Sequence, residues 1–244
     1  MHAAIDHLVF GAATLEDGSR WLEEQLGVPL SPGGQHLTMG THNRVLRLGA
    51  DVYLEVIAVD PSLPSPARPR WFSLDAPWMR THLQESPQLI AWVARSDRLH
   101  EAGAAYPSFG DVTVMSRGAF AWEITIPQDG ELVEHGVIPR LIRWRDGKDP
   151  AATLPDRGVR LEAFRLFHPA PRHIAEALAV AGFDPDFAGR HIVAGDVARI
   201  EVSLAGPQGE VHLSSPPSSE LHRHHAVPQH AAPHEPACRE VGKA

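Results

Sequence analysis

The sequence is poor in cysteine, and Cys238 is the only one among 244 residues. A single cysteine cannot form a disulfide within the chain, which excludes the disulfide-stapled folds typical of secreted proteins. The first residues also lack the basic and apolar regions of a secretory signal peptide. We therefore expect a cytoplasmic protein.

Long apolar runs and basic clusters are missing as well. The longest apolar stretches, such as residues 52–59, have the length of a strand and are interrupted by Glu55, whereas about 20 residues are needed to cross a bilayer. The formal net charge is −8, so the chain offers few positive charges that could neutralise the phosphates of a nucleic acid. The expected partner is a small molecule, not a membrane or nucleic acid, and a homodimer is left open.

Hydrophobic patterning in the first 60 residues predicts a strand, a helix and three further strands. Thr14 is a typical residue before a helix, and Gly27 is typical of the residue after one. Alternation of apolar and polar residues predicts the strands. The expected elements are a strand at 5–10, a helix at 15–26, a strand within 28–40, and strands at 43–48 and 52–59. Residues 1–60 are thus predicted to form one βαβββ module.

The order of elements returns later in the chain. Residues 61–87 are rich in proline and have little periodicity, which predicts an irregular connection. Strand starts near residues 5, 89 and 160 indicate an internal repeat. The expected elements are strands at 89–94, 112–115, 119–126, 137–144, 161–167, 197–204 and 210–213, with helices at 98–105 and near 174–181. Residues 88–216 are assigned to a second module with a C-terminal strand-helix-hairpin extension, and 217–244 to a disordered tail rich in histidine and proline.

Two stretches of the first module resemble a known family. They read Ile-Asp-His-Leu-Val at residues 5–9 and Gly-Thr-His-Asn at 40–43, the latter leading to Tyr-Leu-Glu-Val-Ile-Ala-Val-Asp at 53–60. They resemble glyoxalase-like proteins of the vicinal-oxygen-chelate (glyoxalase/bleomycin resistance/dioxygenase) superfamily, whose second half resembles residues 138–155. The resemblance implies an α+β fold in which paired βαβββ modules form a curved mixed sheet around a central cleft.

The same resemblance implies metal ligands on the first and fourth strands of each module. His7 and Glu55 match these positions, and His42 is a candidate third ligand. A carboxylate on an apolar strand face is costly to bury unless it is paired, metal-bound or hydrated. A hydrogen-bonded core histidine and a groove-facing glutamate would also explain the pattern. We predict His7, Glu55 and His42 as metal ligands, with Glu55 and His42 also as catalytic groups, since histidine moves protons near neutral pH.

The second module offers different side chains. Its first strand has no histidine or carboxylate, and its last strand has Arg140 and Arg143 instead. A divalent metal of unknown identity and a metal-free site therefore both stay open. Arg140 is predicted to bind a carboxylate or enediolate oxygen, and Trp144 to stack on the substrate or donate a hydrogen bond to it.

Together these features favour an enzyme for a small polar metabolite with adjacent oxygens. A bound ion would polarise a carbonyl and stabilise an enolate while a proton is transferred, as in a metal-dependent lyase, isomerase or dioxygenase. The alternative is a binding or drug-sequestering protein that uses the same cleft without chemistry. A weaker one is a structural domain that recruits another protein. Fold alone does not choose among them.

Overall fold

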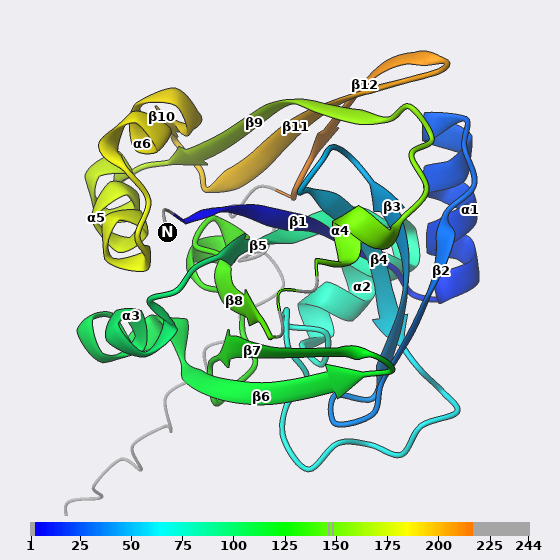
Figure 1. Ribbon diagram of the computed structural model, residues 1–244, viewed down its shortest axis with the longest axis horizontal. Helices are drawn as coiled ribbons and strands as arrows, with labels where there is room; N and C mark the ends of the chain where they lie inside the picture. Colours follow the sequence, from blue (N-terminus) through cyan, green and yellow to red (C-terminus); the bar gives the residue numbers. More distant parts are fainter. Residues whose placement is uncertain (1–2, 146, 148, 217–244) are drawn as a thin grey trace, which may run out of the picture.

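Two sheets make up the computed structural model, which describes residues 3–145, 147 and 149–216 (Figure 1). The tail predicted to be disordered, 217–244, lies outside these residues. The large sheet has eight strands in the order β2-β3-β4-β1-β5-β8-β7-β6, and the small one has four in the order β10-β9-β11-β12. The predicted α+β class, with a curved mixed sheet, is confirmed.

The first module has the predicted order of elements. They are β1 (Ala4–Gly11), α1 (Leu15–Leu26), β2 (Ser31–His36), β3 (Thr41–Arg47) and β4 (Tyr53–Val59). Helix α1 begins where the hydroxyl of Thr14 accepts a hydrogen bond from the backbone N–H of Asp17, and it ends at Gly27, whose φ is 69°. Both ends follow the signals in the sequence.

The connection at 61–87 contains a helix that the sequence did not indicate, α2 (Pro77–Glu85). The second module then begins with β5 (Gln88–Arg95), α3 (Leu99–Ala105), β6 (Asp111–Arg117), β7 (Phe120–Ile126) and β8 (Arg140–Trp144). The expectation of a wholly irregular connection at 61–87 is wrong for α2. This helix starts at Pro77 with no side-chain cap. Proline is well suited to a first helical turn, but it also looks like a loop residue in a sequence.

The two modules join at the centre of the large sheet. Strand β1 runs parallel to β4, β5 runs parallel to β8, and β1 pairs with β5 in antiparallel orientation. The sheet curls until its outer edges, β2 and β6, come close to each other. Near this approach the hydroxyl of Thr38 lies 3.3 Å from the sulfur of Met115. The result is a nearly closed barrel whose two edges meet without backbone pairing, a boundary that we call the seam.

A C-terminal unit covers the convex face of the large sheet (Figure 1). Its elements, preceded by α4 (Pro150–Thr153), are β9 (Arg160–His168), α5 (Pro171–Ala181), α6 (Pro185–His191), β10 (Ile192–Ala194), β11 (Arg199–Gly206) and β12 (Gly209–Ser214). Leu8 and Trp92 of the large sheet share one apolar cluster with Phe164 and Ile200 of the small sheet. No helix of the described part of the chain is long and apolar enough to cross a membrane.

Helix α2 occupies the opposite, concave face. Met79 and Leu83 of this helix pack in a second apolar cluster with Val9 and Val93 of the central strands. Half of the barrel interior is therefore filled by apolar side chains, and polar groups are left to the other half.

Candidate functional site

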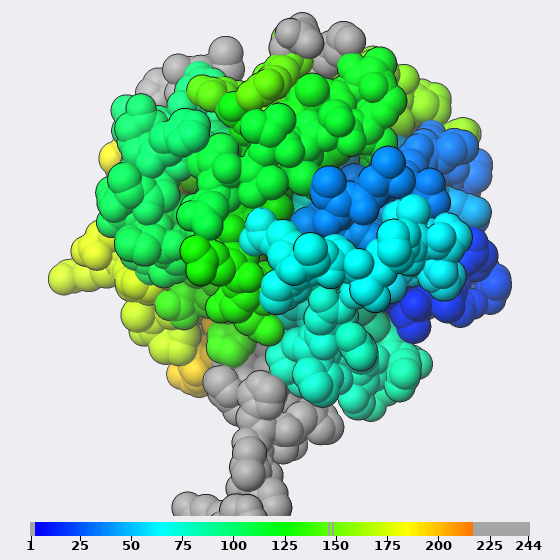
Figure 2. Space-filling view, turned by 90° about the horizontal axis from the view of Figure 1, so that it is seen from below, coloured from blue at the N-terminus to red at the C-terminus, as the bar shows by residue number. Residues whose placement is uncertain are grey.

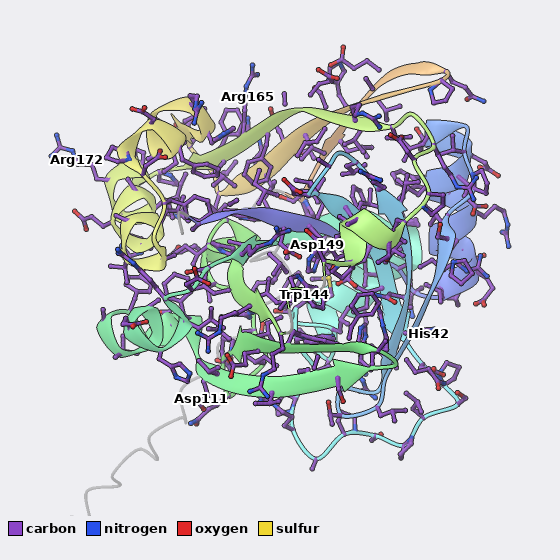
Figure 3. The ribbon with its side chains drawn as sticks, viewed as in Figure 1. His42, Asp111, Trp144, Asp149, Arg165 and Arg172 are labelled. Atoms are coloured by element: carbon purple, nitrogen blue, oxygen red, sulfur yellow. The ribbon has the colours of Figure 1, made fainter. Side chains whose placement is uncertain are left out.

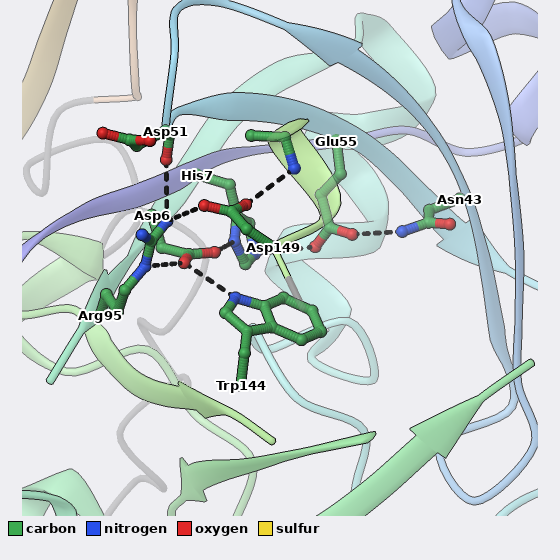
Figure 4. Close-up of polar contacts among 9 residues, drawn as sticks. Asp6, His7, Asn43, Asp51, Glu55, Arg95, Trp144 and Asp149 are labelled. Atoms are coloured by element: carbon green, nitrogen blue, oxygen red, sulfur yellow. Dashed lines mark hydrogen bonds and ion pairs between the residues drawn. The ribbon is translucent and has the colours of Figure 1, made fainter. Parts of the chain in front are cut away.

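A buried charged pair lies on two neighbouring strands of the first module. His7 is on β1 and Glu55 is on β4, and the parallel pairing sets Val9 opposite Glu55. The Nε2 atom of His7 lies 3.6 Å from Oε1 of Glu55, with side-chain exposures of only 5% and 6% (Figure 4). The structure thus brings together His7 and Glu55, the two residues predicted as ligands on the first and fourth strands.

Asp6 contacts the His7 ring at Nδ1, whereas Glu55 lies near Nε2. The Oδ1 atom of Asp6 lies 2.7 Å from Nδ1 of His7, while its Oδ2 accepts hydrogen bonds from Nε of Arg95 at 3.0 Å and from Nε1 of Trp144 at 2.9 Å. Consecutive strand residues normally point to opposite faces, but a bulge in the β1–β5 pairing between Ile5 and His7 interrupts this alternation. The carboxylate fixes the imidazole with Nε2 directed toward Glu55.

Asn43 and Arg117 continue the chain of contacts beyond Glu55. The amide nitrogen of Asn43 donates to Oε2 of Glu55 at 2.5 Å, and its Oδ1 accepts from Nη1 of Arg117 at 2.7 Å. The same Nη1 lies 3.3 Å from Nε2 of His36. Polar contacts therefore run without a break across the barrel, from Asp6 on β1 to Arg117 on β6.

These contacts determine the charges of the site. Burial lowers the pKa of His7, but the hydrogen bonds to Asp6 and Glu55 outweigh it and raise that pKa to about 9. For Glu55, burial acts upward, yet the hydrogen bond and charge of His7 bring the pKa down to about 2. Burial lowers the pKa of His36 to about 4. At neutral pH an imidazolium thus faces a carboxylate, beside a neutral histidine.

The pair opens into a small cavity of about 20 Å³. This is room for about one water molecule or one ion. Aromatic side chains form much of its wall, namely Tyr53, Trp71, Phe72, Trp122 and Trp144. The indole N–H of Trp71 is buried and has no hydrogen-bond partner among the described residues. The site therefore combines a charged centre, aromatic walls and an unused donor.

Comparison with known proteins identifies the family. The profile of the glyoxalase-like domain matches residues 5–182. This chain belongs to the glyoxalase-like domain family. The resemblance of its sequence to glyoxalase-like proteins is thereby confirmed. Comparison with curated proteins gives no significant match.

Three solved structures are similar to this glyoxalase-like protein, and the first of them supports its fold. A hypothetical protein from Staphylococcus aureus, 14% identical, has a TM-score of 0.53 over 88% of this chain and 85% of that one. Methylmalonyl-CoA epimerase from Mycobacterium tuberculosis is 16% identical, with a TM-score of 0.35 over 57% and 85%. A mutant 4-hydroxymandelate synthase from Streptomyces coelicolor is 16% identical, with a TM-score of 0.39 over 89% and 64%.

His42 lies apart from the pair in the glyoxalase-like barrel. It precedes Asn43 on β3 and points to the other face of the strand, where its Nδ1 lies 3.4 Å from Oδ2 of Asp60. There it lines an outer groove of about 770 Å³. Figure 3 shows His42 at the margin of the molecule and Trp144 in its interior. Its position does not support the predicted roles of third ligand and base beside Glu55.

Of the two residues predicted to bind substrate, only Trp144 lines the cavity. Trp144 lines the cavity and donates to Asp6. Arg140 faces the same side of β8 but is not among the residues that line the cavity. Its guanidinium is buried against the carbonyl of Glu131, and its Nη1 has no hydrogen-bond partner in the described chain. Arg143 points away and pairs with Glu123.

The donor set fits a metal only in part. Nε2 of His7 and Oε1 of Glu55 are close enough for one ion to contact both. In the second module, Val93 of β5 pairs with Arg140, just as Val9 of β1 pairs with Glu55. An arginine thus stands where a second carboxylate would be needed. The described residues form no group of three or more His, Cys, Asp or Glu that could hold an ion.

Proposed function

We propose that this glyoxalase-like protein is an enzyme that transfers a proton on a small metabolite with adjacent oxygens. The observation that carries the proposal is the His7–Glu55 pair, buried at the cavity and held on both sides by Asp6 and Asn43. A buried ion pair adds little net stability compared with apolar side chains of the same volume. A charged pair kept at a cavity is therefore better explained by chemistry than by stability.

The proposed reaction uses the two partners as base and acid. A substrate that inserts between them weakens their contact, which raises the pKa of the Glu55 carboxylate toward the range of a useful base. Glu55 then takes a proton from a carbon next to a carbonyl, and the C–H electron pair moves to give an enolate. Nε2 of His7 donates a hydrogen bond to the enolate oxygen. Return of the proton to carbon gives an isomer.

The remaining residues position this pair. Asp6 sets the orientation of the imidazole, and Asn43 fixes one oxygen of Glu55 so that the other faces the cavity. A divalent ion, if His7 and Glu55 held one, would polarise the substrate oxygens as a Lewis acid. We assign the proton transfer to Glu55, and we assign the hydrogen bond to the enolate oxygen to His7.

A second candidate function is binding without reaction. The aromatic wall formed by Trp71, Trp122 and Trp144 favours a planar ligand. A protein that sequesters such a compound would use the same cavity, with the charged pair as a polar anchor.

Solvent-deuterium exchange distinguishes the two functions. A panel of 2-oxo acids, dicarbonyls and hydroxyketones is incubated with the protein in D2O, and incorporation of deuterium at carbon is followed by NMR. We expect Glu55→Gln to slow exchange by about 100-fold or more while the fold is retained. Glu24→Gln, on the exposed face of α1, is the matched control. Exchange at the parental rate in Glu55→Gln would refute the assignment. Binding without any exchange by the parent would favour sequestration.

A further inference from the structure

A metabolite cannot enter the barrel as it stands. The cavity measures about 20 Å³, whereas ligand sites typically measure about 300 to 1,000 Å³. The barrel must therefore open somewhere. Between neighbouring strands, opening would break backbone ladders such as the seven-residue β3–β4 pairing.

The seam between β2 and β6 is the exception. These strands are the two ends of the large sheet and do not pair with each other. Figure 2 shows the green surface of β6 and β7 adjoining the blue surface of the β2–β3 region. Side chains make the polar contacts across the seam, and they include Thr38 with Met115 and Arg117 with Asn43 and His36. Opening at the seam leaves every backbone ladder intact.

Arg117 is the central contact of the seam. Its side chain lies over Gly34, where a Cβ atom would come within 2.8 Å of Cδ of Arg117. Glycine thus provides the space in which the guanidinium reaches Asn43 inside the barrel. Any side chain at position 34 would push Arg117 away from the cavity.

The charge of Arg117 has no counter-charge beside it. Its hydrogen-bond partners, the Asn43 amide and the neutral His36 ring, carry no negative charge, and no carboxylate of the described residues forms an ion pair with it. A guanidinium is suited to bind a carboxylate through two parallel hydrogen bonds. The unused N–H of Trp71 in the same cavity also calls for an acceptor oxygen.

We propose that the ligand is a planar carboxylate that enters through the seam, and that Arg117 exchanges its contact with Asn43 for the carboxylate of this ligand. Arg117 then determines specificity, and the aromatic wall holds the planar body of the ligand. The inference depends on the proposed site for its location, but it does not depend on the chemistry proposed there.

The first experiment measures the preference for charge. Dissociation constants are determined by calorimetry for phenylpyruvate and benzoate, and for the neutral analogues phenylacetone and benzamide. We expect the carboxylates to bind about 10- to 100-fold more tightly, the range for a hydrogen-bonded charge pair. Arg117→Gln should abolish this preference, and Arg117→Lys should restore part of it. Arg80→Gln, at an exposed ion pair, is the control.

Two results would overturn this part of the inference. One is an unchanged preference in Arg117→Gln, and the other is an absence of binding by every carboxylate to the parent. If Arg117→Gln loses the preference but the parent shows no deuterium exchange, Arg117 is confirmed and the proposed enzyme function fails instead.

The second experiment locks the seam. Thr38→Cys and Met115→Cys are combined in a Cys238→Ser background, because the side chains of Thr38 and Met115 meet at the seam, and loss of both free thiols verifies that the disulfide has formed before binding is measured. After oxidation, phenylpyruvate should fail to bind within the time that suffices for the parent, and dithiothreitol should restore binding. Thr38→Cys alone is the control. Equal binding by the oxidised and reduced forms would show that the ligand enters elsewhere.

Discussion

The two halves of the barrel interior share a strand plan and differ in what their side chains do. In the first module, β1 and β4 present His7 and Glu55 to the cavity. In the second, β5 presents Val93, and β8 presents Arg140 at the position paired with it. The comparison shows that a repeated backbone can place a charged pair on the inner strands of one half and leave the equivalent strands of the other half without it.

The two halves are also held together by different forces. The first relies on hydrogen bonds and charges that converge on Asp6, Glu55 and Asn43. The second relies mainly on apolar packing against α2, whose Met79 and Leu83 also share one apolar cluster with Val9 of the first module. Substitutions in the two halves should therefore fail in different ways.

The largest loss of stability is expected from a substitution of Asp6, which the polar contacts of the first module share. Asp6→Asn keeps the volume but leaves Arg95 and His7 without the charge that they face in a fully buried position. Removing one partner of a buried ionic network costs about 3 to 5 kcal/mol. Urea unfolding measures this loss. Asp17→Asn, at an exposed ion pair, should lose less than about 1 kcal/mol, and equal losses for the two variants would contradict the prediction.

A smaller effect is expected from the apolar half. Leu83→Ala removes a buried side chain that packs closely enough for a Cβ on Gly11 to meet it at 3.1 Å. The expected loss is about 2 to 4 kcal/mol, with the pH dependence of stability unchanged. The same unfolding series tests it, and Leu37→Ala, 68% exposed, should change stability by less than about 0.5 kcal/mol. A changed pH profile in Leu83→Ala would show that the halves are not independent.

The last effect depends on pH and approaches zero in alkaline solution. The pKa of His7 rises from 6.5 to about 9 on folding, so its contribution is complete below pH 6.5 and is lost as the pH rises through 9. The pKa of Glu55 falls from 4.5 to about 2, so its contribution is lost only as the pH falls through that range. In thermal melts, His7→Gln should be less stable than the parent at pH 6.5 and approach it near pH 9. His100→Gln, which is exposed, should run parallel to the parent at every pH.

Local signals explain how much of the fold the sequence predicts. Helix α1 has a capping residue and a terminal glycine, and both act within a few residues of it. Helix α2 has neither, and its stability comes from packing against strands that are distant in sequence. A helix that depends on tertiary contacts leaves a weak trace in its own segment.

The residues of the site divide in the same way, into those with a local signal in the sequence and those that only tertiary contacts bring together. His7 and Glu55 stand out because polar residues on apolar strands are conspicuous, and the family resemblance selects their positions. Simple alternation along β1 would place Asp6 on the strand face opposite to His7, and the bulge that brings the two together is not visible in an alternating pattern. Arg117 meets Asn43 across 74 residues, and only the curvature of the sheet brings them together. His42 was selected for its chemistry, although alternation along β3 turns it outward.

The pairing of β1 with β5 has a consequence for aggregation. Both strands are buried along most of their length, and each covers the hydrogen-bonding edge that the other would expose alone. An uncovered apolar edge is a template for pairing with further chains. A fragment that stopped before residue 88 would therefore be expected to aggregate, although it would contain both His7 and Glu55.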